Sequence, residues 1–370
     1  MRTHWLSLLC AASAMAFGQP APPVWQMQDS GTTAGLRGID SVDGTVAWAS
    51  GTGGTVLRTV DGGAHWTRCA VPDGEKDGAT LDFRGVQAWD AKTAIVMASG
   101  PGNKSRLYKA TDGCGTWKLL YKNPDKDGFW DAVAFNTKDR GFILGDPVGG
   151  RFVLYFTLDG GKTWGRVKTA DLEAENGKAG GFAASNSEMT LGYDGLPMFG
   201  TSGPGGPWLY VPDNVCTMVT AQEHPAACFD GELRFEKVKM PLAGESTTAG
   251  IFSLTYRPSG GETVAVGGDY RRPNEVSGTA SVARAMWHYP LGPTEAVEIP
   301  PHGYRSTVQW SDSLKVWITA GTNGSDISRD DGRTWQPLDD GNWNALSLPF
   351  IVGPNGRIAR LNPSAIPAGK

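Results

Sequence analysis

The sequence predicts an all-β protein and, within that class, a seven-bladed β-propeller of four-stranded antiparallel blades. Three observations support this prediction: a composition rich in turn-forming residues, a short motif that recurs along the chain, and the spacing of its copies. Glycine and proline make up 75 of the 370 residues, about a fifth of the chain, against roughly an eighth in average usage. This composition favours many short strands over a helical bundle or a doubly wound α/β enzyme.

The recurring motif has the form S/T-x-D-x-G-x-x-W. Clean copies span residues 59–66, 157–164 and 328–335, and a degraded copy spans 110–117. Its aspartate can accept backbone N–H bonds within a turn, its glycine supplies a positive φ, and its tryptophan packs at the start of the next strand. We therefore expect peripheral turns between third and fourth strands, with a structural role rather than a calcium or sugar site. The residues concerned are Asp61, Asp112, Asp159, Asp330, Trp66, Trp117, Trp164 and Trp335.

The spacing of the motif tryptophans predicts the number of blades. Trp66 precedes Trp117 by 51 residues, and Trp117 precedes Trp164 by 47. Trp335 follows 171 residues later, which fits three units of about 57 residues. A propeller blade takes roughly 40–50 residues, so two middle blades carry insertions and lack the motif. The predicted blades span 36–72, 81–124, 129–170, 180–241, 248–300, 303–338 and 343–361.

The last predicted blade is one strand short at its C-terminal end. Residues 24–28 have the pattern of an outer strand, and Trp25 precedes Trp66 by 41 residues, about one blade. We expect this segment to complete the last blade, because closing the ring removes exposed sheet edges. The inner strands are expected at residues 36–39, 83–86, 130–133, 181–184, 251–254, 304–307 and 343–346.

The N-terminal residues 1–18 predict a secretory signal peptide. A positive start at Arg2 precedes an apolar run from Leu6 to Ala16, which ends in small residues. No other stretch approaches the roughly 18 apolar residues of a membrane span. We therefore expect residues 19–370 to form one exported domain, periplasmic or extracellular, without a membrane span.

Cysteine usage agrees with export. One of the five cysteines lies in the signal segment, and the four that remain allow three pairings. Structural disulfides are favoured because the chain contains no C-x-x-C motif of the zinc-binding or thioredoxin type. The simplest pairing joins near neighbours in the repeat plan, Cys69 with Cys114 and Cys216 with Cys228. The latter pair falls in residues 197–241, which we expect to be an irregular insertion available for partner contact.

The motif copies, the glycine-rich turns and the sevenfold closure resemble the photosystem II stability/assembly factor-like family of secreted Asp-box (BNR-repeat) propellers. The resemblance covers essentially the whole mature chain. It implies a non-enzymatic protein, since plant and cyanobacterial members act as assembly factors that bind a membrane-protein client. Asp boxes also occur in sialidases, and bacterial relatives often carry a glycosyl hydrolase label from the repeat alone.

The candidate site residues are those that a propeller brings to one face of its hub. Loops that enter first strands and loops that join second to third strands converge there, around the axial channel. Arg37, Arg84 and Arg305 start three inner strands and would form an anion-binding mouth, because guanidinium forks pair bidentately with carboxylate or phosphate. The other expected residues are Asp131, Asp146, Ser253, Asp269, Tyr270, Ser306 and Asn344. Alternatively, the arginines neutralise these aspartates and tie the blades together.

The predicted function is binding of a protein client or an anionic ligand at this mouth, by a monomer without cofactor or metal. A net charge of −4 offers no basic surface for nucleic acid. No H-E-x-x-H, G-x-S-x-G or P-loop motif occurs.

The alternative function is a sialidase-like glycoside hydrolase acting on envelope or extracellular glycans. Such an enzyme needs two carboxyl groups roughly 5 Å or 6.5–9.5 Å apart, for which Asp131, Asp146 and Asp269 are the candidates. Against this alternative, Arg37-Gly38-Ile39 replaces the R-I-P segment of sialidases, and no tyrosine–glutamate pair can be placed by spacing.

Overall fold

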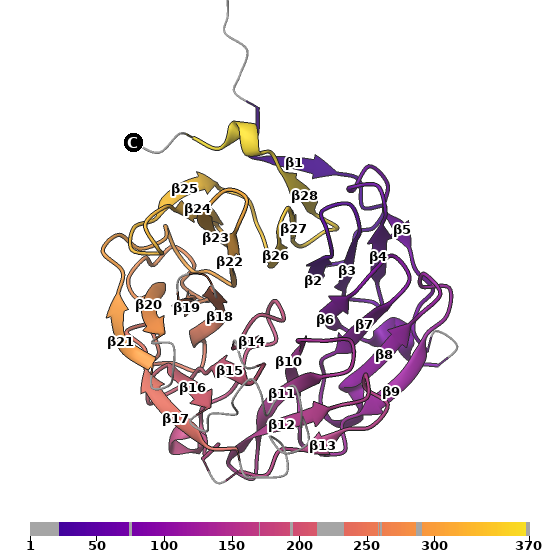
Figure 1. Ribbon diagram of the computed structural model, residues 1–370, viewed down its shortest axis with the longest axis horizontal. Coiled ribbons are helices and arrows are strands. Elements are labelled where there is room, and N and C mark those ends of the chain that lie inside the picture. The colour runs from indigo at the N-terminus through magenta and orange to yellow at the C-terminus, as the bar shows by residue number, and fades with distance from the viewer. Residues whose placement is uncertain are drawn as a thin grey trace, which may run out of the picture.

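The computed structural model describes residues 22–73, 76–169, 171–192, 195–212, 233–257, 259, 261–285 and 291–367. Within these residues, seven four-stranded sheets stand as blades around a central axis (Figure 1). Each sheet is antiparallel, with consecutive strands running from the hub to the rim in six of the blades. The predicted fold class is confirmed.

The strand bounds follow the repeat plan. Blade 1 contains β2 (Leu36–Ser41), β3 (Ala47–Gly51), β4 (Val56–Thr59) and β5 (Thr67–Arg68). Blade 2 contains β6 (Phe83–Ala88), β7 (Ala94–Ala98), β8 (Arg106–Ala110) and β9 (Lys118–Lys122). Blade 3 contains β10 (Trp130–Phe135), β11 (Gly141–Val148), β12 (Arg151–Thr157) and β13 (Gly165–Arg166). Blade 4 contains β14 (Met189–Leu191), β15 (Pro197–Gly200), β16 (Trp208–Pro212) and β17 (Phe235–Lys239).

The second half of the ring repeats the pattern. Blade 5 contains β18 (Ala249–Arg257), β19 (Glu262–Asp269), β20 (Ala280–Ala285) and β21 (Leu291–Ala296). Blade 6 contains β22 (Thr307–Ser311), β23 (Val316–Gly321), β24 (Gly324–Ser328) and β25 (Gln336–Asp339). Blade 7 contains β26 (Ala345–Ser347), β27 (Phe350–Val352), β28 (Ile358–Leu361) and β1 (Trp25–Gln28). Short 3₁₀ turns occur at Gly78–Thr80, Gly102–Lys104, Glu175–Gly177 and Pro363–Ala365.

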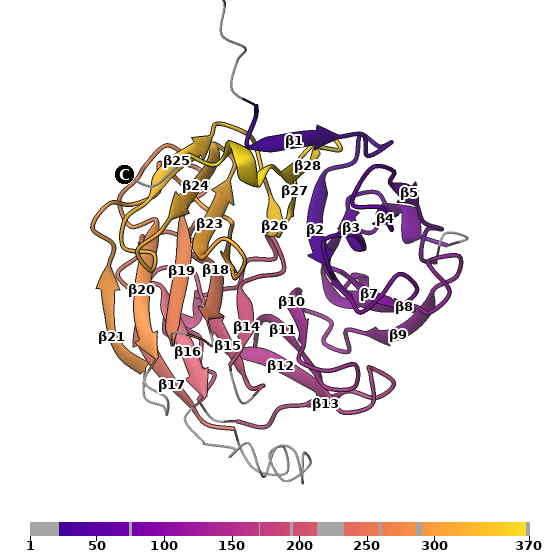
Figure 2. The same ribbon diagram turned by 45° about the horizontal axis from the view of Figure 1, so that its top comes forward.

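The N-terminal strand closes the ring, as predicted. β1 pairs antiparallel with β28, with Trp25 opposite Leu361, and Figure 2 shows the two strands side by side. Trp25 is buried, and its indole N–H donates to Ser325 Oγ of blade 6 at 2.9 Å. The outer edge of the last blade is therefore covered by the other end of the chain, which leaves no half-finished sheet at the seam.

The core lies between the blades rather than inside any one of them. The second strands β3 and β7 are buried along their whole length, and so they read as short continuous apolar runs instead of alternating ones. Between blades 1 and 2, for example, Trp48 packs in one cluster with Phe83 and Tyr108. Each blade thus needs a neighbour on both faces to bury its apolar side chains.

The four motif turns join third to fourth strands in blades 1, 2, 3 and 6. In each turn the aspartate accepts the backbone N–H of the residue four positions ahead, at 2.9–3.2 Å. In the clean copies a preceding hydroxyl also accepts a glycine N–H, as Thr59 does from Gly63 at 2.9 Å. These bonds have the turn-fixing geometry that the sequence predicts for the motif aspartates.

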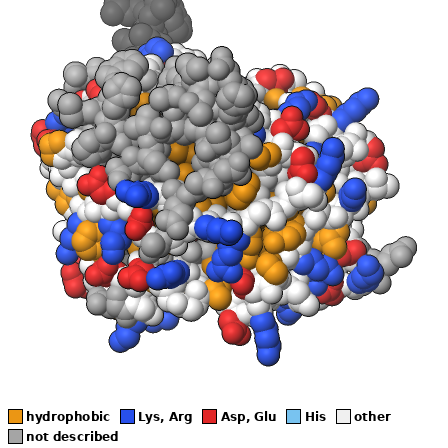
Figure 3. Space-filling model, turned by 60° about the horizontal axis from the view of Figure 1, so that its bottom comes forward, with side chains coloured by type: hydrophobic (Ala, Val, Ile, Leu, Met, Phe, Trp, Pro, Cys, Tyr) orange, Lys and Arg blue, Asp and Glu red, His pale blue; other side chains and the backbone are white. Residues whose placement is uncertain are grey.

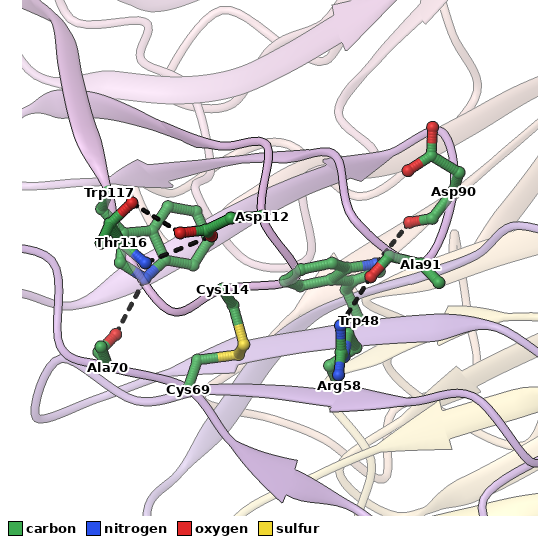
Figure 4. Close-up of a disulfide and its surroundings, with 10 residues drawn as sticks. All are labelled: Trp48, Arg58, Cys69, Ala70, Asp90, Ala91, Asp112, Cys114, Thr116 and Trp117. Atoms are coloured by element: carbon green, nitrogen blue, oxygen red, sulfur yellow. Dashed lines mark hydrogen bonds between the residues drawn. A yellow bond between two sulfur atoms is a disulfide. The ribbon is translucent and has the colours of Figure 1, made fainter.

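A disulfide joins Cys69, at the end of blade 1, to Cys114, in the motif turn of blade 2 (Figure 4). The clean turns have glycine at the position of Cys114, and Cys114 adopts the same left-handed conformation, with φ of 74°. Beside the disulfide, the indole N–H of Trp117 donates to the Ala70 carbonyl at 2.8 Å. The first predicted pair is confirmed; Cys216 and Cys228 lie outside the described residues.

One local prediction for blade 4 is wrong. Residues 181–184 are not its inner strand, which is β14 at Met189–Leu191. They lie instead in the loop before β14, where the Phe182 ring stacks on Phe252 of blade 5 at 3.6 Å between centroids. The described part of residues 197–241 contains three regular strands, β15, β16 and β17, and residues 213–232 of the expected insertion lie outside the described residues.

We expect the disulfide to contribute about 4 kcal/mol to the free energy of unfolding, because its ends are 45 residues apart and cross-linking restricts the unfolded chain. The double variant Cys69→Ser/Cys114→Gly should therefore melt at a lower temperature by scanning calorimetry. Cys69→Ser/Cys114→Ala is the matched control for backbone conformation. It should be less stable than the glycine version by roughly 1 kcal/mol, since alanine resists a positive φ. An unchanged melting temperature in both variants would contradict this account.

Candidate functional site

A cavity of about 460 Å³ opens at the hub, on the face where the first-strand entries and the second-to-third-strand loops converge. Every blade contributes to its wall, either from an inner strand or from the loop that leads into one. At the seam of the ring, the side-chain amide of Asn344 donates to the Leu36 carbonyl at 2.7 Å and joins blade 7 to blade 1. The cavity therefore forms only when the ring of seven blades is closed.

Most of the predicted hub residues line this cavity. They are Arg37, Arg84, Asp131, Asp146, Tyr270, Ser306 and Asn344. Three others, Arg305, Asp269 and Ser253, are not among its lining residues. Residues from seven separate stretches of sequence thus meet at one place, as the propeller geometry predicts.

The expectation that Arg305 joins Arg37 and Arg84 at the hub mouth is wrong. Its side chain is 0% exposed, and its Nε donates to Asp326 at 2.6 Å. Its Nη1 donates to the Tyr304 carbonyl and to Asn323 Oδ1, both at 2.6 Å. The guanidinium thus holds blade 6 together beneath the hub surface and does not face a ligand.

Asp269 and Ser253 also have structural roles, because their side chains bond to other parts of the propeller. Asp269 accepts the Thr248 hydroxyl at 2.7 Å and the Arg272 Nε at 3.1 Å. Burial alone would raise the pKa of Asp269, but these hydrogen bonds and the Arg271 N–H outweigh it and lower the pKa. Ser253 is buried, and its hydroxyl oxygen accepts the Val308 N–H at 3.0 Å, which joins blades 5 and 6.

Arg37 and Arg84 form the basic wall of the cavity. Both pair with one carboxylate, Asp82, at 3.6 Å from Arg37 and 2.8 Å from Arg84. Arg84 also donates to the Ala183 carbonyl at 3.0 Å. Burial, together with the neighbouring Arg84, lowers the pKa of Arg37. Two guanidiniums that share one carboxylate retain donors for a further anionic group.

The acidic wall consists of Asp131 and Asp146, with Glu188 behind them. Asp146 accepts the Gly181 N–H at 2.8 Å. Asp131 Oδ2 and Glu188 Oε2 lie 2.6 and 2.8 Å from the point that a Cβ on Gly181 would occupy. Only glycine fits at this position, and it brings the two buried carboxyl groups close to each other.

Burial raises the pKa of all three carboxyl groups. For Asp131 the charges of Asp146 and Glu188 add to burial, and Arg84 opposes them. The Gly181 N–H partly offsets the rise in the pKa of Asp146. The nearby Phe182 N–H partly offsets it for Glu188, although neither Glu188 oxygen receives a well-formed hydrogen bond. The acidic wall therefore holds protons more firmly than isolated carboxyl groups do.

An aromatic wall faces these charges. Phe182 stacks on Phe252, and Phe252 meets Tyr304 edge to face at 4.7 Å between centroids. Tyr270 stands beside both phenylalanines and is 44% exposed, so it can offer its ring to a ligand. Desolvation by burial raises the pKa of Tyr304, which keeps it neutral. Offset and edge-on aromatic contacts of this kind fix ring positions without charge.

Residues 180–187, which we call the hub loop, contribute four consecutive residues, 181–184, to the cavity wall. Ser185 Oγ donates to the Ser306 carbonyl at 2.7 Å. Asn186 exchanges two hydrogen bonds with the backbone of Val133, at 2.8 and 3.0 Å. With the Arg84–Ala183 bond, the hub loop thus contacts blades 2, 3 and 6 as well as its own.

The sequence contained signals for two residues that the predictions missed. Glu188 directly precedes β14, as Ser306 precedes β22 and Asn344 precedes β26, so correct placement of the inner strand would have found it. Asp82 stands directly before β6, two residues from Arg84. The stacking of Phe182 on Phe252 had no such signal, because it depends on the path of the hub loop.

Comparison with solved structures finds the same architecture in other proteins. A chain described as YCF48 bound to D1 peptide superposes with a TM-score of 0.62 at 15% identity, covering 95% of this chain and 100% of that one. YCF48 from Cyanidioschyzon merolae superposes with a TM-score of 0.58 at 17% identity, covering 92% and 99%. At these identities the likeness shows a shared fold. No family model and no curated protein matches the chain.

We expect Glu188→Gln to stabilise the protein at neutral pH. Burial raises the pKa of Glu188 in the folded state above its pKa in the unfolded chain. The free energy of unfolding is therefore highest below the unfolded-state pKa, and it falls as the pH rises from that pKa toward the folded-state pKa. Glutamine cannot ionise, so the free energy of unfolding of the variant should not fall over this pH range and should exceed that of the parent at pH 7.5. The difference should shrink near pH 4.

Urea unfolding at the two pH values measures this difference. Glu298→Gln removes the same charge from an exposed position and should leave the free energy of unfolding unchanged. A Glu188→Gln protein that is less stable than the parent at pH 7.5 would show that the carboxylate is satisfied in the folded state.

Proposed function

We propose that this chain is a non-enzymatic binding protein that holds a peptide segment of a client protein in the hub cavity. The observation that carries the proposal is the cavity itself, whose basic, acidic and aromatic walls come from seven blades locked into one frame. A volume of about 460 Å³ suits a few side chains and lies in the range of ligand pockets.

The basic wall is suited to a carboxylate of the client. Arg37 and Arg84 already share Asp82, so together they carry one unbalanced positive charge. Both are partly exposed, at 34% and 26% of their side chains, and can reach a ligand. Planar guanidiniums bind carboxylates through paired hydrogen bonds. Arg305 has no part in this site.

The structural neighbours support binding as the class of function. YCF48 is a photosystem II assembly factor, and one of its solved structures holds a D1 peptide. This propeller is thus suited to binding a protein segment, and we extend that class of function to the present chain. We also retain the proposal of an exported monomer acting during envelope protein assembly. In the described residues, no helix is long and apolar enough to cross a bilayer.

The arrangement of carboxyl groups favours binding over glycoside hydrolysis. Of the three candidates, Asp269 is not among the lining residues of the cavity and accepts the Arg271 N–H within a turn. The other two candidates, Asp131 and Asp146, both come from blade 3 and stand on the same wall of the cavity. A glycosidase needs two carboxyl groups that flank the scissile bond.

The exterior gives no reason to expect a nucleic-acid partner. On the face shown in Figure 3, lysine and arginine side chains are interspersed with aspartate and glutamate. The net charge of −4 and the mixed charges on the described part of this face do not favour binding to phosphate backbones. The proposed specificity therefore resides in the hub cavity.

Peptide binding in the hub cavity can be tested by comparing peptide capture by the unmodified protein and by the double variant Arg37→Gln/Arg84→Gln. The probe is a library of N-acetylated hexapeptides with free carboxyl termini. We expect the protein to enrich a defined sequence class, and the double variant to bind its members at least about tenfold more weakly, since hydrogen bonds to charged groups contribute roughly 1.5–3 kcal/mol.

A matched control removes the same charge from the rim. Arg68→Gln/Lys118→Gln changes two exposed positions on β5 and β9 and should bind as the parent does. Failure of the parent to enrich any sequence, or equal affinity in the hub variant, would contradict the proposed function.

A further inference from the structure

The hub contains more acidic groups than its arginines neutralise. Four carboxyl groups, Asp82, Asp131, Asp146 and Glu188, stand on or directly behind the cavity wall. Arg37 and Arg84 are the guanidiniums there, and both are engaged by Asp82. Within the described residues, no lysine, arginine or histidine forms an ion pair with Asp131, Asp146 or Glu188.

Among these carboxyl groups, Asp131 most clearly lacks a neutralising partner. It lines the cavity, yet its residue is 1% exposed and its Oδ2 atom has no hydrogen-bond partner. The neighbouring Asp146 is bonded at Oδ1 by the Gly181 N–H. A buried carboxyl group without a partner is costly, and native proteins retain few such groups. Asp131 and Asp146 both line the cavity, so a cation bound there can pair with their carboxyl groups.

We propose that Asp131 and Asp146 form a subsite for the ammonium group of a lysine side chain in the bound segment. The inference rests on the proposed function, because it names the chemistry that the same cavity selects in its client. A compact ammonium with three donors suits oxygens that come from two different carboxyl groups. A planar guanidinium matches both oxygens of a single carboxylate better.

The aromatic wall fits the rest of such a ligand. Phe182 and Gly181 are consecutive, so the stacked Phe182–Phe252 pair begins directly beside the acidic wall. The lysine stem can lie along these rings with its charged end at Asp131, because long cationic side chains bury their methylenes on apolar surface. Tyr270, with its exposed ring, can cover an aromatic residue next to the lysine.

Binding should be linked to protons. The charged groups that act on Asp131 are Asp146 on β11, Glu188 directly before β14 and Arg84 on β6. Burial raises the pKa of the three carboxyl groups, and a bound cation favours their ionised forms. Ammonium binding therefore releases protons, and affinity rises as the pH increases through their titration range.

The experiment compares two neutral-ended dipeptides on the complete protein. The probes are N-acetyl-phenylalanyl-lysine amide and N-acetyl-phenylalanyl-norleucine amide, which differ in the ammonium group. Isothermal titration calorimetry at pH 7.5 should show at least about tenfold tighter binding of the lysine compound. The preference should fall at pH 5.5, and titrations in two buffers of different ionisation enthalpy should reveal proton release.

Three variants locate the effect. Asp146→Asn and Asp131→Asn should each reduce the lysine preference to less than about threefold, and they provide two routes if one of them folds poorly. Asp312→Asn, which removes an exposed carboxylate with a side chain 79% accessible, should keep the full preference.

The outcomes separate the two proposals. Equal affinity for lysine and norleucine compounds, no binding of the lysine compound up to about 10 mM, or a preference that survives both aspartate variants would overturn the ammonium subsite. A hexapeptide library that yields ligands without lysine would leave peptide binding standing and refute the subsite. A lysine preference in a protein that enriches no hexapeptide would refute the proposed function alone.

Discussion

The pairing of β1 with β28 is the contact on which the rest of the structure depends. Each blade buries its apolar side chains against the next, so an open stack would leave two faces and a sheet edge in water. Trp25 anchors the joint, because its ring packs near Trp343 in blade 7 while its indole N–H reaches Ser325 in blade 6. A few residues at one terminus thereby complete a core whose other members are spread along the chain.

Closure of the ring also determines which side chains come together at the hub. Arg37 and Asn344 line one cavity although they lie at opposite ends of the domain sequence, and the Asn344–Leu36 bond crosses the seam between their blades. The walls of the cavity differ in chemistry because each blade contributes few side chains. The hub loop adds Gly181, Phe182, Ala183 and Ala184 to these walls. Glu188 and Gly181 set the tight spacing behind the acidic wall.

Much of the fold could be predicted because it repeats. The turn chemistry of Asp61 and its counterparts depends on local hydrogen bonds, and the blade count follows from their spacing. The closing strand could be placed because Trp25 fits the same period. The Cys69–Cys114 pair likewise joins adjacent repeats. Periodic sequence constrains such features directly, without knowledge of distant contacts.

The site was predicted less well, because its residues act through non-repeating contacts. Arg305 is one residue out of register with Arg37 and Arg84. Its backbone N–H donates to the Gly267 carbonyl of the preceding blade, as the Leu36 N–H donates to the Gly353 carbonyl, so it occupies the buried position of Leu36, where Asp326 pairs with it. The hub loop breaks the repeat altogether, since stacking of Phe182 on Phe252 replaces strand pairing there. Equivalent positions in a propeller predict where a backbone lies, and the neighbouring side chains then decide which way each group points.

Thermal unfolding of a chain shortened by one strand tests ring closure most directly. A protein of residues 29–370 would be compared with one of residues 19–370 by scanning calorimetry. If β1 completes the wheel, the shorter chain loses the buried Trp25 and a whole edge strand, and should melt about 5–10 °C lower or without a cooperative transition. An identical cooperative transition in the shorter chain would show that the wheel holds together without this strand.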